Sequence, residues 1–199
     1  MQNDDNQYLV LSSILLDKTR YYHNSGEIRT IDGETIYPSN YEYSDIRAWL
    51  NTSFYNSAFF LGDDFIETTT VKFDPQDDGI YSYNDTQDKV FLLTKSDYTN
   101  AYYGFDTTLD QTSTRCCKVT DWIRVTGVYK TGYGTYWTRS PVADSEGRNN
   151  NDLKRAAVYY INGDGICRFW YFDSRTNTDY WSKVLSEYCV RPAITLLID

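Results

Sequence analysis

The tetrapeptide Asn-Gly-Asp-Gly at residues 162–165 constrains the fold of this chain more than any other short stretch. It separates two runs that are rich in aromatic and other strand-forming residues, 156–161 and 166–172. Asn-Gly and Asp-Gly pairs readily adopt the positive φ angles of tight hairpin turns. The sequence therefore predicts an antiparallel hairpin in the C-terminal part of the chain.

Further strands are predicted on both sides of this hairpin by short β-branched or apolar runs. They lie at residues 8–17 (a strand followed by a turn or short helix), 66–73, 89–94, 134–141 and 189–198. The clearest helix is at residues 44–59, where Ser44 is a candidate N-cap. Its expected buried stripe follows the helical period: Ile46, Trp49, Leu50, Phe54 and Ala58. Shorter helices are expected at 96–105 and 119–127, capped by Ser96 and Thr120.

Helices thus precede most of the strands, and no repeat or linker divides the 199 residues. This order predicts an α+β fold in a single domain, 1–199, with short helices followed by a C-terminal antiparallel β-sheet.

The formal net charge of −9 and a pI near 4.6 argue against binding to nucleic acid or to an anionic membrane. No run of 18 apolar residues exists, so membrane insertion is not expected. Residues 1–17 also lack the basic start and cleavage site of a signal peptide. The 20 tyrosines suit either an adhesive surface or the covering of a β-rich core, and both interpretations stay open.

Few residues suit catalysis or metal binding. The single histidine, His23, lies in a polar, turn-rich stretch, which disfavours nucleophilic chemistry that needs a histidine base. The cysteines are expected to be free and mostly buried, with two long-range disulfides as the alternative: Cys116, Cys117, Cys167 and Cys189. An acidic loop could supply oxygen ligands for calcium, although it matches no EF-hand pattern. We predict no cofactor and keep calcium as the alternative. The aspartates of this loop are Asp74, Asp77, Asp78, Asp85 and Asp88.

Five separated blocks carry a family resemblance: YSDIRAWLNTSFYNSAF, DKVFLLT, RCCKVTDW, YWTRSP and VRPAI. Their order resembles that of the domain of unknown function called DUF6273, over about Tyr8 to Leu197. The YWTRSP block, the hairpin and the closing VRPA are also similar to the C-type-lectin-like fold. Formylglycine-generating enzymes and the variable proteins of diversity-generating retroelements use that fold. The resemblance therefore implies a C-type-lectin-like domain, although the calcium-dependent sugar motifs of true C-type lectins are absent.

Within the resemblance, four signature residues are interpreted as structural first: Trp137, Arg139, Arg191 and Pro192. A tryptophan on a central strand fills the core, and arginine ties loop carbonyls or carboxylates through its planar fork. The alternative is that Arg139 and Arg191 bind an anionic ligand. Pro192 is expected where a strand needs no amide donor, at an edge or a bulge.

The stretch between the signature blocks is the predicted ligand-binding surface. If one strand follows the hairpin, Arg168, Trp170 and Phe172 share its exposed face, and a loop follows. Tryptophan, tyrosine and arginine are the residue types of binding hot spots. The predicted site residues are Arg168, Trp170, Phe172, Asp173, Arg175, Asn177, Asp179, Tyr180, Trp181 and Lys183. The alternative places Trp170 and Trp181 in the core.

The leading hypothesis is a non-enzymatic recognition domain that binds a protein or glycan, at a cell surface or on a virion. The resemblance implies that its C-terminal surface is diversified by a retroelement, and 149–151 (Asn-Asn-Asn) fits adenine-directed mutagenesis. Trp170, Trp181 and Lys183 cannot arise from Asn codons in that way and would be fixed. The alternatives are a structural module of a larger surface protein and an oxidase of the formylglycine-generating type, for which Cys167 and Cys189 are the local candidates.

Overall fold

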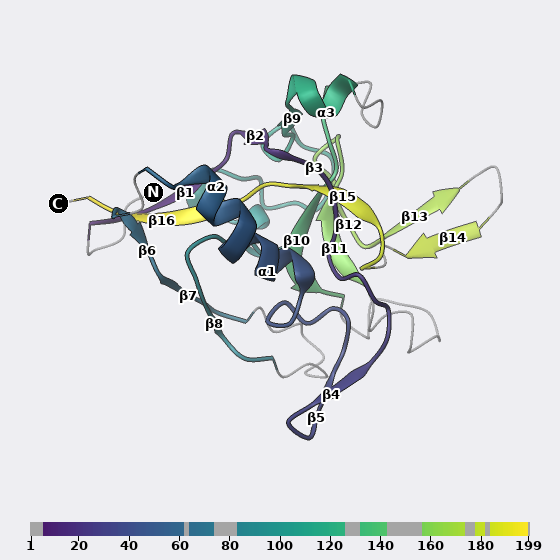
Figure 1. Cartoon of the computed structure of the whole chain (residues 1–199). Coiled ribbons are helices and arrows are strands. Elements are labelled where there is room, and N and C mark those ends of the chain that lie inside the picture. Colours follow the sequence, from purple (N-terminus) through teal and green to yellow (C-terminus); the bar gives the residue numbers. More distant parts are fainter. Residues whose placement is uncertain are drawn as a thin grey trace.

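A computed structural model gives the fold of the whole chain (Figure 1). The structure describes residues 6–61, 64–73, 83–125, 132–142, 157–173, 178–181 and 184–198. At 18–21, 170–173 and 178–181 it describes the backbone alone.

A five-stranded mixed sheet forms the centre of the molecule (Figure 1). Its order is β12 (Cys167–Arg168), β11 (Val158–Ile161), β10 (Tyr136–Pro141), β15 (Glu187–Val190) and β3 (Asp17–Tyr21). The predicted hairpin is confirmed, since β11 and β12 pair antiparallel around a turn in which Gly165 has φ 76°. The sheet is not purely antiparallel, because β10 and β15 run parallel. Nor is it purely C-terminal, because β3 comes from the start of the chain.

A three-stranded antiparallel sheet joins the two ends of the chain (Figure 1). Its order is β1 (Gln7–Leu11), β16 (Ala193–Leu197) and β6 (Ile66–Glu67). Arg191 and Pro192 lie between β15 and β16, so the strand expected at 189–198 is two strands in different sheets. Proline interrupts the ladder there while its carbonyl still accepts from Ser12 N at 3.0 Å.

Among the described residues, four two-stranded pairs lie outside these sheets. They are β2 (Ile14–Leu15) with β9 (Lys118–Val119), β4 (Arg29–Ile31) with β5 (Glu34–Ile36), β7 (Thr69–Val71) with β8 (Thr86–Asp88), and β13 (Trp170–Asp173) with β14 (Thr178–Trp181). The run 89–94 is buried as expected, but it makes only a bridge from Phe91 to Ala193 and is not a strand.

The predicted long helix exists, with a π-helical turn in its middle. Its parts are α1 (Asp45–Trp49), the π-helix η1 (Leu50–Phe54) and α2 (Tyr55–Ala58). Ser44 caps it as predicted, its hydroxyl accepting from Arg47 N at 3.2 Å. Ile46 and Leu50 are buried, but the π turn adds a residue and shifts the stripe beyond it. Phe59 packs against the core and Ala58 is exposed, contrary to the prediction.

The remaining helices of the described segments are short: η2 (Asp97–Thr99), η3 (Ala101–Tyr103) and α3 (Asp121–Val125). Thr120 caps α3 as predicted, its hydroxyl accepting from Ile123 N at 3.3 Å. Ser96 makes no side-chain cap. Thr94 and Asp97 instead bond each other's peptide nitrogens, both at 2.8 Å, because a reciprocal pair satisfies two donors at once.

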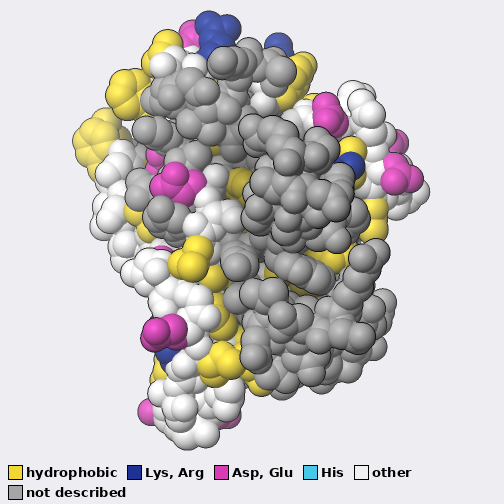
Figure 2. All heavy atoms as spheres, turned by 90° about the vertical axis from the view of Figure 1, so that its right-hand side faces the viewer, with side chains coloured by type: hydrophobic (Ala, Val, Ile, Leu, Met, Phe, Trp, Pro, Cys, Tyr) yellow, Lys and Arg dark blue, Asp and Glu magenta, His cyan; other side chains and the backbone are white. Residues whose placement is uncertain are grey.

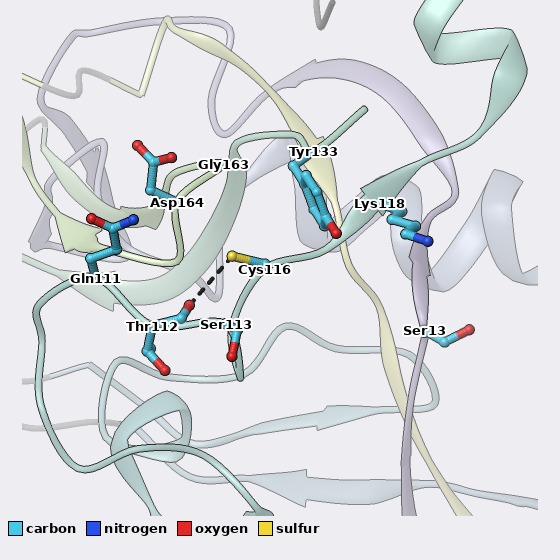
Figure 3. Close-up of a pocket in the computed structure, with 9 residues that line it drawn as sticks. All are labelled: Ser13, Gln111, Thr112, Ser113, Cys116, Lys118, Tyr133, Gly163 and Asp164. Atoms are coloured by element: carbon cyan, nitrogen blue, oxygen red, sulfur yellow. Dashed lines mark hydrogen bonds between the residues drawn. The ribbon is translucent and has the colours of Figure 1, made fainter. Parts of the chain in front are cut away.

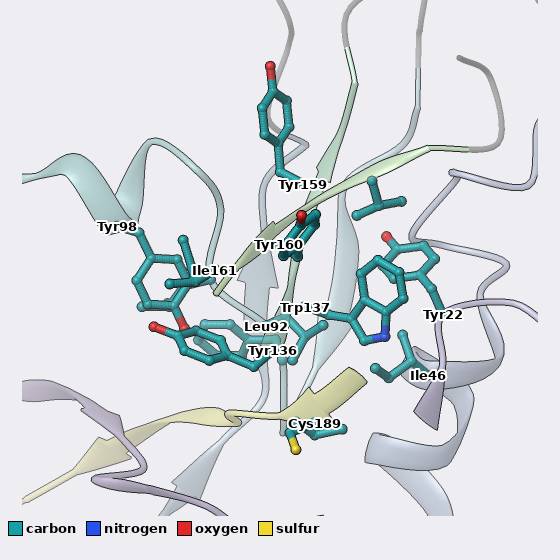
Figure 4. Packing of buried hydrophobic residues seen from close by; sticks show 14 of the residues in the cluster. Tyr22, Ile46, Leu92, Tyr98, Tyr136, Trp137, Tyr159, Tyr160, Ile161 and Cys189 are labelled. Carbon is teal, nitrogen blue, oxygen red and sulfur yellow. The ribbon is translucent and has the colours of Figure 1, made fainter. Parts of the chain in front are cut away.

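Aromatic side chains fill both sides of the central sheet (Figure 4). Trp137 is fully buried beside Tyr22, with ring centroids 5.5 Å apart, while Tyr98 and Tyr136 pack 5.5 Å apart. Several of the tyrosines therefore belong to the core, and the expected structural role of Trp137 is confirmed.

His23 gives the fold a pH dependence that can be measured. Its Nδ1 accepts from Ser25 N at 3.0 Å, and its buried Nε2 has no partner among the described residues. Burial lowers the pKa of His23, Arg29 lowers it further, and Asp45 partly opposes them. The unfolded chain therefore binds the proton first, near pH 6.5, as the pH falls. The contribution of His23 to the free energy of unfolding is therefore complete above that pH. It declines below that pH until the folded protein also takes up the proton.

We expect the unfolding free energy to fall below pH ~6.5 by at most about 1.4 kcal/mol per pH unit relative to His23→Asn. In that variant the amide oxygen can replace Nδ1 as the acceptor. Urea denaturation of both proteins from pH ~7.5 to ~5.5 measures the difference. Parallel curves across this window would contradict the role given to His23, which is the single histidine of the chain.

Candidate ligand-binding site

The β13–β14 hairpin stands apart from the five-stranded sheet (Figure 1). Its register pairs Trp170 with Trp181 and Asp173 with Thr178. Within the described part of the chain, neither strand pairs with any other. The hairpin is therefore a separate ribbon that continues from the edge strand β12.

The expectation of one long strand followed by a loop is wrong. β12 ends at Arg168, the chain bends at Phe169, and the supposed loop contains the strand β14. Phe169 packs edge-on against Tyr159, with ring centroids 5.3 Å apart. Tyr159 is the residue opposite Phe169 in the β11–β12 register, but β12 ends before Phe169, so the alternation of faces does not run unbroken from Arg168 to Phe172.

A groove beside the hairpin crosses one face of the five-stranded sheet. We call it the sheet-face groove; it encloses about 540 Å³ and is lined by Thr135, Tyr160, Asn162, Arg168, Ser186, Glu187 and Tyr188. The register explains why these residues meet: Tyr160 lies opposite both Trp137 and Arg168 on neighbouring strands. Residues directly opposite, or two apart along a strand, share a face.

The floor of the sheet-face groove is a packed aromatic row. Tyr188 lies 4.5 Å from Trp137 and 4.9 Å from Tyr160, measured between ring centroids. Trp137 and Tyr160 are buried, and Tyr188 is half-buried. Such a floor holds its shape because each ring is fixed by its neighbour.

Arg168 forms part of this groove with an uncommitted charge. Its side chain is exposed and has no hydrogen-bond or ion-pair partner among the described residues. A guanidinium offers a planar fork that bonds carboxylates in a bidentate way and stacks on aromatic rings. Glu187, on the rim, adds an acceptor, so the groove presents both signs of charge beside an aromatic surface.

The predicted site residues divide into three groups. Arg168 lines the sheet-face groove. The backbone of Trp170, Phe172 and Asp173 lies on β13, and that of Asp179, Tyr180 and Trp181 on β14. Arg175, Asn177 and Lys183 lie outside the described residues. The structure thus brings the first two groups to one end of the molecule, and Tyr160, Asn162 and Tyr188 were missed.

The signature arginines are structural, as expected. Arg139 donates to the carbonyls of Leu92, at 2.8 Å, and Lys72, with Asp97 3.8 Å away. Arg191 donates to Ser12 O at 2.9 Å and to the Tyr136 hydroxyl at 3.1 Å. Both side chains are largely buried and hold loops to strands.

Arg115 has the same role on a larger scale, and sequence reasoning missed it. It is fully buried and donates to four carbonyls, those of Gly165 (2.7 Å), Tyr98 (3.2 Å), Asp106 (3.0 Å) and Asp110 (2.6 Å). The available signal was an arginine with no acidic residue within four positions, next to two cysteines.

A second hollow of about 460 Å³ lies beside the Asn162–Gly165 turn (Figure 3). It contains the partly exposed Cys116, with Lys118, Tyr133 and Asp164 around it. The thiol donates to Thr112 O at 3.3 Å. Burial raises the pKa of Cys116, Asp164 raises it further, and Arg115 opposes them, so the thiol stays protonated near neutral pH.

All four cysteines are free, as expected, and Cys117, Cys167 and Cys189 are buried. Of the acidic loop, residues 74–82 lie outside the described part. Asp85 accepts from Phe73 N at 2.8 Å, and Asp88 is buried against Arg47 at 2.7 Å. Among the described residues, no cluster of His, Cys, Asp or Glu could hold a metal ion.

On the face of the molecule shown in Figure 2, the basic side chains of the described residues are scattered. In the same part of the chain, no helix is both long and apolar enough to cross a membrane.

Comparisons with known proteins agree with the sequence blocks. No curated protein and no solved structure matches the chain significantly. One family model matches residues 5–198, and its description is a domain of unknown function, DUF6273. The match covers almost the whole chain, which therefore belongs to the DUF6273 family.

Proposed function

We propose that this chain is a non-enzymatic recognition domain of C-type-lectin-like fold. It binds a protein or glycan through the sheet-face groove and the β13–β14 hairpin. The observation that carries the proposal is a ribbon that pairs only with itself, within the described residues, beside the uncommitted Arg168.

The contrast between the arginines supports this assignment. Arg115, Arg139 and Arg191 are committed to carbonyl oxygens that hold the fold together. Arg168 has no such task among the described residues, and it lies beside two tyrosines. A rigid aromatic surface with an available guanidinium is the composition of binding hot spots.

The arrangement of the cysteines favours recognition over the oxidase alternative. Cys167, Ile161, Tyr136 and Cys189 form one row across four neighbouring strands. Three inter-strand spacings of about 4.8 Å place the two cysteines roughly 14 Å apart. A copper ion cannot bridge two sulfur ligands over that distance.

Diversification by a retroelement is part of the proposal. Along the chain, the hairpin follows β12 and precedes β15, and in the described residues it pairs with neither strand. Changes in its outer residues would therefore leave the central ladder intact. The Asn149–Asn151 run lies outside the described residues. A reverse-transcriptase gene near the coding sequence, with a template repeat matching the last ~60 codons, would support it. Changes confined to adenine positions are expected, with Trp170, Trp181 and Lys183 fixed.

Binding is tested with a glycan microarray and, in parallel, a displayed library of bacterial envelope protein fragments. For any ligand found, we expect Arg168→Ala to weaken affinity about tenfold or more. Trp170→Ala with Trp181→Ala should abolish binding with little change in melting temperature. The matched control is Arg124→Ala, an exposed arginine on α3 that should bind normally.

Two outcomes would contradict the proposed surface. Binding that is indifferent to Arg168 and to both tryptophans would place the site elsewhere. If the double tryptophan variant loses about 3 kcal/mol or more of its free energy of unfolding, those rings belong to the core. A chain that binds neither library favours the alternative, a structural module of a larger surface protein.

A further inference from the structure

β1 is an edge strand whose outer peptide groups lack partners among the described residues. Ser12 N donates to Pro192 O at 3.0 Å and Ile198 N to Asn6 O at 3.2 Å. With the Val10–Ile194 register, these bonds show that the peptide groups of Tyr8 and Val10 face β16. Those of Gln7, Leu9 and Leu11 therefore face away, and they have no hydrogen bond to any described residue.

Within the part of the chain that the structure describes, this edge has none of the usual protection against pairing. Natural edge strands are kept short, or carry lysine, proline or a bulge. β1 reads Gln-Tyr-Leu-Val-Leu and pairs with β16 over its whole length without a register shift. By contrast, β6 and β12 have two residues each, and β3 contains Lys18 and Arg20.

We propose that β1 pairs antiparallel with β1 of a second copy of this chain, about a two-fold axis at Leu9. The two three-stranded sheets then form one continuous six-stranded sheet. Leu9 lies opposite the partner's Leu9, and Gln7 opposite the partner's Leu11. Since these are the residues with outward peptide groups, each pair exchanges both of its hydrogen bonds.

The side chains of β1 fit a copy of themselves. In this register Tyr8 lies opposite the partner's Val10, and aromatic with β-branched pairs stabilise antiparallel strands. Val10 is 40% exposed and borders an apolar hollow of about 180 Å³, which the partner's Tyr8 ring would enter. The hollow is lined by Val10, Ser12, Leu16, Phe54, Phe59, Pro192 and Ile194. No charged residue occurs in β1, so no like charges meet there.

The dimer leaves the proposed ligand surface open. Figure 1 shows β1 and the β13–β14 hairpin at opposite ends of the molecule. Two copies joined at β1 would thus present two sheet-face grooves, and both could engage one multivalent surface.

The association is tested first by sedimentation equilibrium of the whole chain at about 200 µM protein. Each copy carries a net charge of −9, so screening should strengthen the dimer as NaCl rises from about 0.05 to 0.5 M. Val10→Lys places an ammonium group opposite the partner's Tyr8 and should weaken the dimer about tenfold or more. Val125→Lys is the matched control, because Val125 is 74% exposed on α3, and it should dimerise normally.

Oxidative cross-linking tests the register in a Cys116→Ser background. In Leu9→Cys the two new thiols face each other across the axis, with Cα atoms about 5.5 Å apart, which suits a disulfide. Val10→Cys faces the partner's Tyr8 and should cross-link far less. A monomer in ~0.5 M NaCl, a dimer indifferent to Val10→Lys, or equal cross-linking of both variants would overturn the proposal. So would a monomer that instead accepts an extended peptide of another protein along β1.

Discussion

Replacing Arg115 by methionine should remove a large share of the free energy of unfolding of this protein. The fully buried guanidinium donates to four carbonyls, from Tyr98, Asp106, Asp110 and Gly165. Methionine has a similar length but donates nothing, so these carbonyls lose their donor without gaining water. Each buried unsatisfied group costs about 1–3 kcal/mol, so a loss of roughly 4 kcal/mol or more is expected. That is a large share of the stability of an ordinary domain, about 5–15 kcal/mol.

Arg124→Met on α3 is the matched control. Its side chain is 58% exposed and contacts Asp121 at 2.8 Å, an exposed pair that contributes less than about 1 kcal/mol. Arg115→Lys tests the geometry, because lysine keeps the charge but cannot spread its donors over four carbonyls. Urea denaturation measures all three variants. A value for Arg115→Met within about 1 kcal/mol of the unchanged protein would contradict the role given to this side chain.

Local features of the fold could be predicted from sequence because their causes lie within a few residues. Ser44 and Thr120 cap the helices that follow them, and the Asn162–Gly165 turn forms the expected hairpin. The α+β class follows from the same signals. The five family blocks were sufficient to indicate DUF6273, and the family match confirms it.

Other features depend on partners far along the chain. β10 and β15 pair in parallel across more than forty residues, and no local pattern records that choice. The π turn in the long helix moves Phe59, in place of Ala58, to the core, which a fixed 3.6-residue period cannot predict. Of the four carbonyls bound by Arg115, that of Gly165 is likewise distant, 50 positions along the chain.

The sequence predicted part of the geometry around Arg168 and missed the rest. Arg168 is exposed as expected, since a charged residue on an edge strand remains exposed, and it lines the sheet-face groove. The bend at Phe169 falls within an unbroken aromatic run that carries no turn residue, so the sequence alone favoured one continuous strand. Tyr160 and Tyr188 were missed because their meeting requires the β15–β10–β11 order.

Gly165→Ala should be the most damaging glycine substitution in the described part of the chain. Gly165 has φ 76°, and a Cβ there would overlap the Thr112 carbonyl oxygen. The turn is held against this loop by Thr112 N to Asp164 O at 3.3 Å and by Arg115 Nε to Gly165 O. Relieving the overlap must lengthen these bonds. The weakened hydrogen bonds and the cost of a positive φ for alanine together should lower the free energy of unfolding by about 4 kcal/mol.

Gly104→Ala separates the two causes of that loss. Gly104 has a similar φ of 80°, but a methyl group added there would meet nothing within 4 Å beyond its chain neighbours, so this variant carries only the backbone cost of about 1–2 kcal/mol. The difference between the variants, measured by urea denaturation, is therefore the energy of the close approach between the hairpin turn and the Thr112 loop. Equal losses would mean that the turn can move away from the loop freely. The sheet-face groove would then lack a fixed end at Asn162, since the same turn positions that residue.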